Sequence, residues 1–180
     1  MKALILSLAV LGVVSFSTPA RADVVVIEGE RGELDPNLLV IDPGDLFNGV
    51  ISVEYERALS RHFGITVGAS VWAFHGPFSF YDSSGYYTAF MPELGARFHF
   101  IREAPGGLWI GPTVSAGYVA ANSTGQVSRN IAWGLGAAGG YNFVIGRHFT
   151  FQLGIGGRFT DYGDRLVWSP RLILGLGAVF

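Results

Sequence analysis

Cysteine is absent from this 180-residue chain, and charged side chains are scarce. Without cysteine the chain has no disulfide and no thiolate ligand for a metal. Charged residues make up 14% of the chain, compared with about 25% in ordinary soluble domains, and this is too few to cover the outside of a soluble fold. The net charge of −2 and the lack of any basic run predict no nucleic-acid partner.

A long hydrophobic helix is also missing beyond the first 22 residues. No later segment holds 18 uninterrupted apolar residues, as a spanning helix would. The first 22 residues have instead the features of a secretory signal peptide. Lys2 precedes an apolar stretch over Ala3–Phe16, and Ala20-Arg21-Ala22 is a small-x-small cleavage site. A single membrane anchor is the alternative, although it would need about 20 apolar residues. We expect cleavage after Ala22 and export from the cytoplasm.

Glycine is abundant, with 26 residues, and aromatic side chains make up 14% of the chain. Along seven stretches, large apolar residues alternate with small or polar residues. A period of two marks strands with two different faces, and strands of about ten residues broken by turns are typical of transmembrane β-barrels. The seven stretches are residues 51–59, 63–71, 90–100, 107–118, 130–143, 149–159 and 166–180.

An eighth strand is required, because a single-chain barrel of this type has an even number of strands. It must lie between Asp23 and Leu46. We favour 34–41, followed by turn-forming residues over 42–45. The rival, 24–28, is too short, since a strand needs about 9–11 residues to cross a bilayer.

The predicted fold class is therefore all-β, an antiparallel transmembrane β-barrel of eight strands. Residues 1–22 are assigned to the signal peptide, 23–33 to an N-terminal tail and 34–180 to the barrel. The connections are expected to alternate between short turns on the periplasmic side and longer loops outside. The short turns are 60–62, 102–106 and 146–148, and the outer loops are 76–85, 121–129 and 160–165.

The two faces of the strands decide between a membrane barrel and a soluble sandwich or lipocalin-like barrel. A soluble protein buries its large apolar face, whereas here the opposite face is mostly Gly, Ser and Thr with a few charges. Only a closed sheet pairs all of its backbone groups in lipid, so we assign the large side chains to the lipid. Six charged residues then face the interior by parity and are expected to pair there, because a lone buried charge is costly. They are Glu54, Glu56, Glu93, Arg97, Arg158 and Arg171.

About eight strands enclose a space that side chains can fill, so we expect a plugged barrel. Aromatic residues on the lipid face fall into two girdles. The outer girdle is Phe90, Tyr118, Trp133 and Trp168, and the inner one is Phe63, Phe98, Phe100, Phe143, Phe149 and Phe180. Trp72, Phe74 and Trp109 fall on the inner face and are expected only to fill space.

The signal peptide, the alternating strands and the terminal Phe180 after Leu172, Leu174, Leu176 and Ala178 resemble small outer-membrane barrels of the OmpA, OmpW and opacity-protein type. Within that group, residues 37–39, 53–59 and 104–112 look like an uncharacterised family of unknown function. The resemblance implies that Phe180 is a signal for the barrel assembly machinery. It supplies no active site, and we expect no peptidoglycan-binding domain after the barrel, unlike in full-length OmpA-like proteins.

No residue set predicts catalysis, a metal site or a cofactor. His75 precedes Ser79 and Asp82, but polar loops commonly hold these residue types. No paired histidine and carboxylate motif for zinc is present. The other histidines are expected in turns or in the interior: His62, His148 and His99.

We therefore expect a monomeric integral protein of the outer membrane with a filled polar interior and a structural or surface-interaction role, and not an enzyme. Its expected partners are outer-membrane lipid and lipopolysaccharide, and the barrel assembly machinery during biogenesis. A narrow channel for small solutes or ions is the alternative. An enzyme that modifies lipid A is the third possibility.

Overall fold

The computed structural model describes residues 22–25, 31–34, 36–43, 50–72, 85–123, 126–146, 148–163 and 166–180. Within these ranges, no helix is both long enough and apolar enough to cross a membrane. The predicted signal peptide lies outside the described residues except for Ala22, and most of the predicted outer loop 76–85 lies outside them too.

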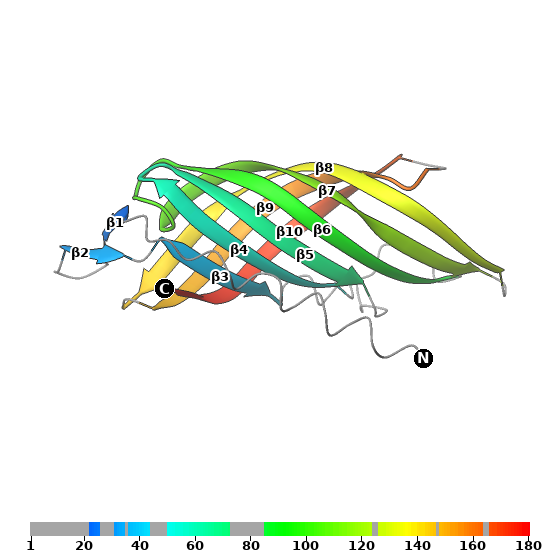
Figure 1. Ribbon diagram of the computed structural model, residues 1–180, viewed down its shortest axis with the longest axis horizontal. Coiled ribbons are helices and arrows are strands. Elements are labelled where there is room, and N and C mark those ends of the chain that lie inside the picture. Colours follow the sequence, from blue (N-terminus) through cyan, green and yellow to red (C-terminus); the bar gives the residue numbers. More distant parts are fainter. Residues whose placement is uncertain are drawn as a thin grey trace.

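Eight antiparallel strands close into a barrel in the order β10-β3-β4-β5-β6-β7-β8-β9 (Figure 1). The eight-stranded prediction is therefore confirmed. The strands are β3 (Asn37–Asp42), β4 (Val50–Ser60), β5 (Phe63–Trp72), β6 (Gly85–His99), β7 (Gly107–Ser123), β8 (Gln126–Ile145), β9 (Phe149–Asp161) and β10 (Leu166–Val179).

The first barrel strand is the one whose position the sequence left most open. β3 lies at the favoured place but runs over Asn37–Asp42 instead of 34–41. It closes the barrel by pairing with β10 on one side and β4 on the other. The rival segment contributes to a separate two-stranded sheet, in which β1 (Ala22–Val25) pairs with β2 (Arg31–Leu34). Part of the predicted tail is thus a small ribbon outside the barrel wall.

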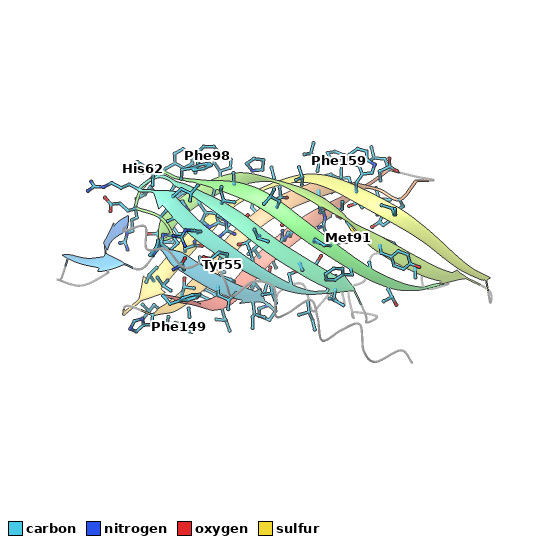
Figure 2. All side chains as sticks on the ribbon, viewed as in Figure 1. Tyr55, His62, Met91, Phe98, Phe149 and Phe159 are labelled. Atoms are coloured by element: carbon cyan, nitrogen blue, oxygen red, sulfur yellow. The ribbon has the colours of Figure 1, made fainter. Side chains whose placement is uncertain are left out.

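Successive side chains along each barrel strand alternate between the inside and the outside of the wall, as the period of two predicts. Along β10, Leu172 and Leu176 are 50% and 47% exposed, whereas Ile173 between them is 3% exposed. The other barrel strands follow the same rule, so a band of large apolar side chains surrounds the wall (Figure 2). A soluble domain of this size would bury such a band in its core. This barrel instead has its apolar face on the outside.

The three short connections and the chain end after β10 share one end of the barrel. The turns after β4, β6 and β8 lead into β5, β7 and β9 there, and Phe180 exchanges backbone hydrogen bonds with Asn37 at 3.0 and 3.2 Å. We call this the periplasmic end, because short turns mark that side in outer-membrane barrels.

The predicted outer loop 121–129 is wrong over most of its length. β7 continues to Ser123 and β8 begins at Gln126, with pairs such as Ala121 opposite Ser128. Polar, turn-forming residues predicted a loop, but a hairpin can extend its ladder beyond the barrel because each strand satisfies the backbone groups of the other. The wall is therefore uneven, with 20 residues in β8 and six in β3 (Figure 1).

Glycines on the inner face allow the wall to close around a narrow interior. A Cβ at Gly140 would lie 2.8 Å from Gly154 Cα, 3.0 Å from Trp109 Cζ2 and against the carbonyl oxygen of Leu153. Its neighbour Gly139 points outward, and a Cβ there would approach nothing closer than 3.3 Å. Gly140, the inner position, has no room for a side chain, whereas Gly139, the outer position, has almost enough room for a Cβ atom.

We predict that Gly140→Ala lowers the free energy of unfolding by about 1–3 kcal/mol, as overpacking does. The matched substitution Gly139→Ala should cost less than half as much. Urea titration of folding into detergent micelles, followed by tryptophan fluorescence, measures both. Equal losses for the two variants would contradict the steric explanation.

Candidate functional site

Four ionisable side chains meet inside the periplasmic half of the barrel. Arg97 from β6 reaches two carboxylates of β4. Its Nη1 lies 2.8 Å from Glu56 Oε2, and its Nη2 contacts Glu54 Oε1. His99, two residues further along β6, places Nε2 2.7 Å from Glu56 Oε1. We call Glu54, Glu56, Arg97 and His99 the lower cluster.

Small residues on the intervening strand make this cluster possible. β5 lies between β4 and β6 and presents Gly64, Thr66 and Gly68 to the interior. A Cβ at Gly64 would lie 2.5 Å from Glu56 Oε1. The carboxylate thus occupies the space that a larger β5 side chain would fill. The ion pairs cross over β5 instead of running along one strand.

An aromatic ring and an amide complete the surroundings of Arg97. The guanidinium carbon lies 3.8 Å from the ring centroid of Trp109, a cation–π contact. The indole Nε1 of Trp109 donates to Asn142 Oδ1 at 2.9 Å. Trp109 therefore does more than fill space, because it faces a buried cation and orients it. Sequence parity placed Trp109 inside but contained no signal for this contact.

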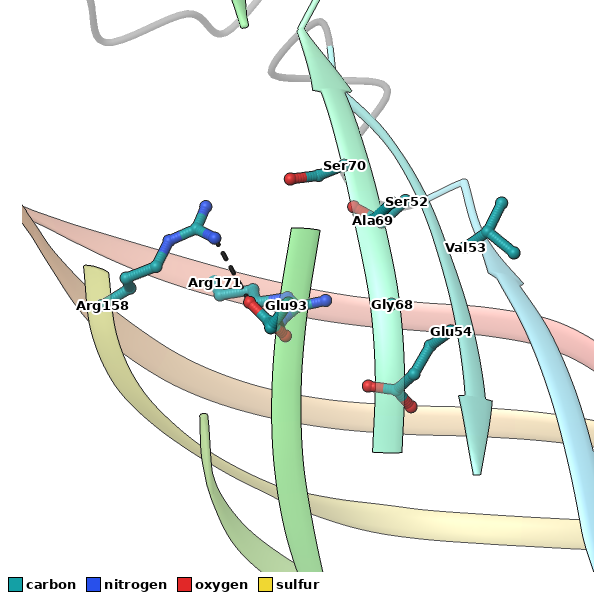
Figure 3. Close-up of a pocket in the computed structure, with 9 residues that line it drawn as sticks. All are labelled: Ser52, Val53, Glu54, Gly68, Ala69, Ser70, Glu93, Arg158 and Arg171. Carbon is teal, nitrogen blue, oxygen red and sulfur yellow. Dashed lines mark hydrogen bonds and ion pairs between the residues drawn. The ribbon is translucent and has the colours of Figure 1, made fainter. Parts of the chain in front are cut away.

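A second group of charges, the upper cluster, lies further from the periplasmic end. Glu93 of β6 receives Arg158 from β9 at 3.3 Å and Arg171 from β10 at 2.9 Å (Figure 3). These strands are not neighbours of β6 in the barrel order. The side chains therefore meet across the lumen, and the upper cluster ties opposite walls together.

The turn between β6 and β7 folds into the periplasmic mouth. Ala104 is fully buried and Pro105 is among the most deeply buried side chains. Asn142 Nδ2 donates to the carbonyl of Pro105 at 2.6 Å, and the backbone N–H of Ala104 donates to the carbonyl of Arg61 at 2.8 Å. This turn was predicted only as a short connection, and its inward course is a finding of the structure.

His99 joins that turn to the lower cluster. Its Nδ1 lies 3.0 Å from the carbonyl oxygen of Gly106, while its Nε2 faces Glu56. Both partners are hydrogen-bond acceptors. The ring thus links the end of the turn to a buried carboxylate.

The structure places all six sequence-predicted charges inside the barrel, three in each cluster. Two further residues belong with them. His99 was expected as an interior hydrogen-bonding residue whose partner the sequence did not identify, and Asp42, which accepts the backbone N–H of Leu174 at 3.1 Å, was assigned only to a turn. Its even position on β3 would have indicated an inward side chain. His75, Ser79 and Asp82 lie outside the described residues.

Small cavities lie beside the two clusters in the described part of the barrel. Two cavities in the described part of the barrel each leave about 10 Å³ for the centre of a water molecule, roughly what a single water needs. One lies between the two clusters, beside Ser52 and Ser70, and the other lies beside Trp109 and Thr113. In the described part of the barrel, both cavities are lined by side chains of the two clusters.

No protein-family model matches the chain, and no curated protein matches it at a significant level. Solved structures of other proteins do match the chain. Neisserial surface protein A aligns with a TM-score of 0.57 and 14% identity, covering 80% of this chain and 93% of the other. The N-terminal β-barrel domain of Pseudomonas aeruginosa OprF has the same score and identity, covering 81% and 98%. The chain has the eight-stranded fold of these small outer-membrane barrels.

We predict that Arg97→Met destabilises the protein by about 3–5 kcal/mol, because it leaves buried carboxylates without their cation. The control is Arg61→Met, which removes an exposed ion pair with Glu103 (3.4 Å, Arg61 64% exposed). It should cost about 1 kcal/mol or less. Urea unfolding in micelles measures both, and a loss at Arg97 as small as that at Arg61 would show that the lower cluster contributes little to stability.

Proposed function

We propose that this chain is a monomeric integral protein of the outer membrane, with a lumen closed by its own side chains and a structural or surface-interaction role. Paired charges inside an apolar wall support the proposal. The ion pairs of the upper cluster cross the lumen from β6 to β9 and β10, and those of the lower cluster join β4 to β6. The β6–β7 turn occupies the periplasmic mouth. A barrel built in this way is suited to span the lipid bilayer with its outer end exposed to the outside of the cell.

The apolar band supports the membrane location. Ile155 is 72% exposed, Leu94 53% and Leu135 54%, and such a continuous belt is stable in hydrocarbon and unstable in water. Aromatic side chains at both ends of the band support the two girdles, with Trp133 and Trp168 at the outer end and the Phe63–Phe98 pair at the other, ring centroids 5.2 Å apart.

The proposed partners follow from this location. Lipid and lipopolysaccharide surround the wall, and the barrel assembly machinery inserts the chain, with Phe180 as the residue it reads. Phe180 is 51% exposed at the periplasmic end, where such a signal is accessible. The outer end, where the β7–β8 hairpin extends beyond the barrel, is the part available for contacts outside the cell.

We predict no stable conductance when the purified protein is inserted into a planar lipid bilayer. A variant in which residues 102–105 are replaced by Gly-Gly should stay closed as well, because both charge clusters remain inside the lumen. Regular current steps from the unmodified protein would contradict a closed lumen and favour a narrow channel. Arg171→Ala, which opens the upper cluster, tests whether any such current passes between the arginines and Glu93.

A further inference from the structure

The lipid-facing side of the barrel carries a single basic residue among the strand side chains that the structure describes. Arg57 follows Val53 and Tyr55 on the outward face of β4. The other charged residue on that face, Asp161, lies at the outer end of β9 and accepts the backbone N–H of Gly163 at 2.7 Å. Arg57 is therefore an exception that the fold has to accommodate in lipid.

Two polar neighbours accompany Arg57 on the same face. Asn37 begins β3 and is paired with Arg57 across the strands. Its Oδ1 accepts the hydroxyl of Tyr55 at 2.6 Å and faces Arg57 Nη1 at 3.4 Å. The backbone of Asn37 is bonded in turn to Phe180 at the periplasmic end. Tyr55 is labelled in Figure 2. Asn37, Tyr55 and Arg57 thus form one polar patch at the β10–β3–β4 seam.

The depth of the patch identifies the level of the membrane that it meets. Arg57 lies three residues before the end of β4 at Ser60, which at about 3.4 Å per residue and a tilt near 45° is about 7 Å above the strand end. An arginine facing lipid costs about 2–4 kcal/mol at the midplane but about 0–1 kcal/mol near the interface. Its long side chain can reach the interface while its stem stays in hydrocarbon.

We propose that Arg57, positioned by Asn37 and Tyr55, binds the headgroup phosphate of one phospholipid of the periplasmic leaflet. This inference rests on the proposed membrane location. The planar guanidinium of Arg57 matches a phosphate with two parallel hydrogen bonds. Asn37 Oδ1, which accepts from both Tyr55 and Arg57, positions the guanidinium at the seam. Leu39, Leu59 and Ile65, which are 38%, 49% and 38% exposed on the same face, supply the surface for an acyl chain.

Native mass spectrometry of the full chain, released from micelles that contain phosphatidylglycerol, tests the site. The unmodified protein should retain one phosphatidylglycerol and should not retain diacylglycerol, which has the same chains but no phosphate. Arg57→Gln should lower the retained phosphatidylglycerol about tenfold, because it removes a charge-assisted pair, and Tyr55→Phe should lower it less. Arg61→Gln is the matched control. It removes a basic residue from the adjacent turn, outside the lipid face, and should leave retention unchanged.

Three outcomes overturn the site: retention of diacylglycerol as well as of phosphatidylglycerol, no loss in Arg57→Gln, or displacement of the lipid by inorganic phosphate at an equal concentration. Each variant is first floated with lipid vesicles and examined for a heat-dependent shift in gel mobility. An unmodified chain that does not insert contradicts the membrane location itself. A chain that inserts without a headgroup preference contradicts only the phospholipid site.

Discussion

The rest of the structure depends on one constraint: a narrow closed barrel has an interior that must be filled, and each charge inside it needs a partner. Burying an ion without a counter-ion costs more free energy than most single interactions contribute to the stability of a folded protein. The lower cluster meets this requirement by placing Arg97 between Glu54 and Glu56, with His99 on the far side of Glu56. The upper cluster meets it by directing two arginines at Glu93. Strand positions, inner glycines and the inward turn all accommodate these contacts.

The same constraint explains why the distribution of residue types is reversed relative to a soluble domain. Charges are few and most of those on the described strands face the centre, whereas leucine, isoleucine and phenylalanine face outward. Backbone groups need no solvent, because every strand has two neighbours in the closed sheet. A wall with this arrangement is stable in lipid. The outer end of the barrel and Arg57 on the wall are the places where we propose contacts with other molecules.

Sequence reasoning succeeded where a property depends on a single strand. The side of the wall on which Leu172 or Ile173 lies follows from odd and even positions, and seven of the eight strands were recognised in this way. It failed where the outcome depends on a neighbour. Residues 121–129 carry polar, turn-forming types, yet most of them pair as strands, because a hairpin partner satisfies the backbone whatever its side chains. The turn before β7 gave no sign that Ala104 and Pro105 would be buried, since their burial requires Asn142 of β8 and Arg61 of the β4–β5 turn, which are distant in the sequence.

By itself, then, the order of residues determined a two-faced strand pattern, an even strand number and the six charged residues that point inward. Only the tertiary structure decided which of these charges meet. Glu56 and Arg97 are 41 residues apart, and Glu93 and Arg171 are 78 apart. No local period relates such positions. Closure of the sheet and the offset between neighbouring strands set the height of each side chain in the lumen, and two charges pair when that height brings them to the same level.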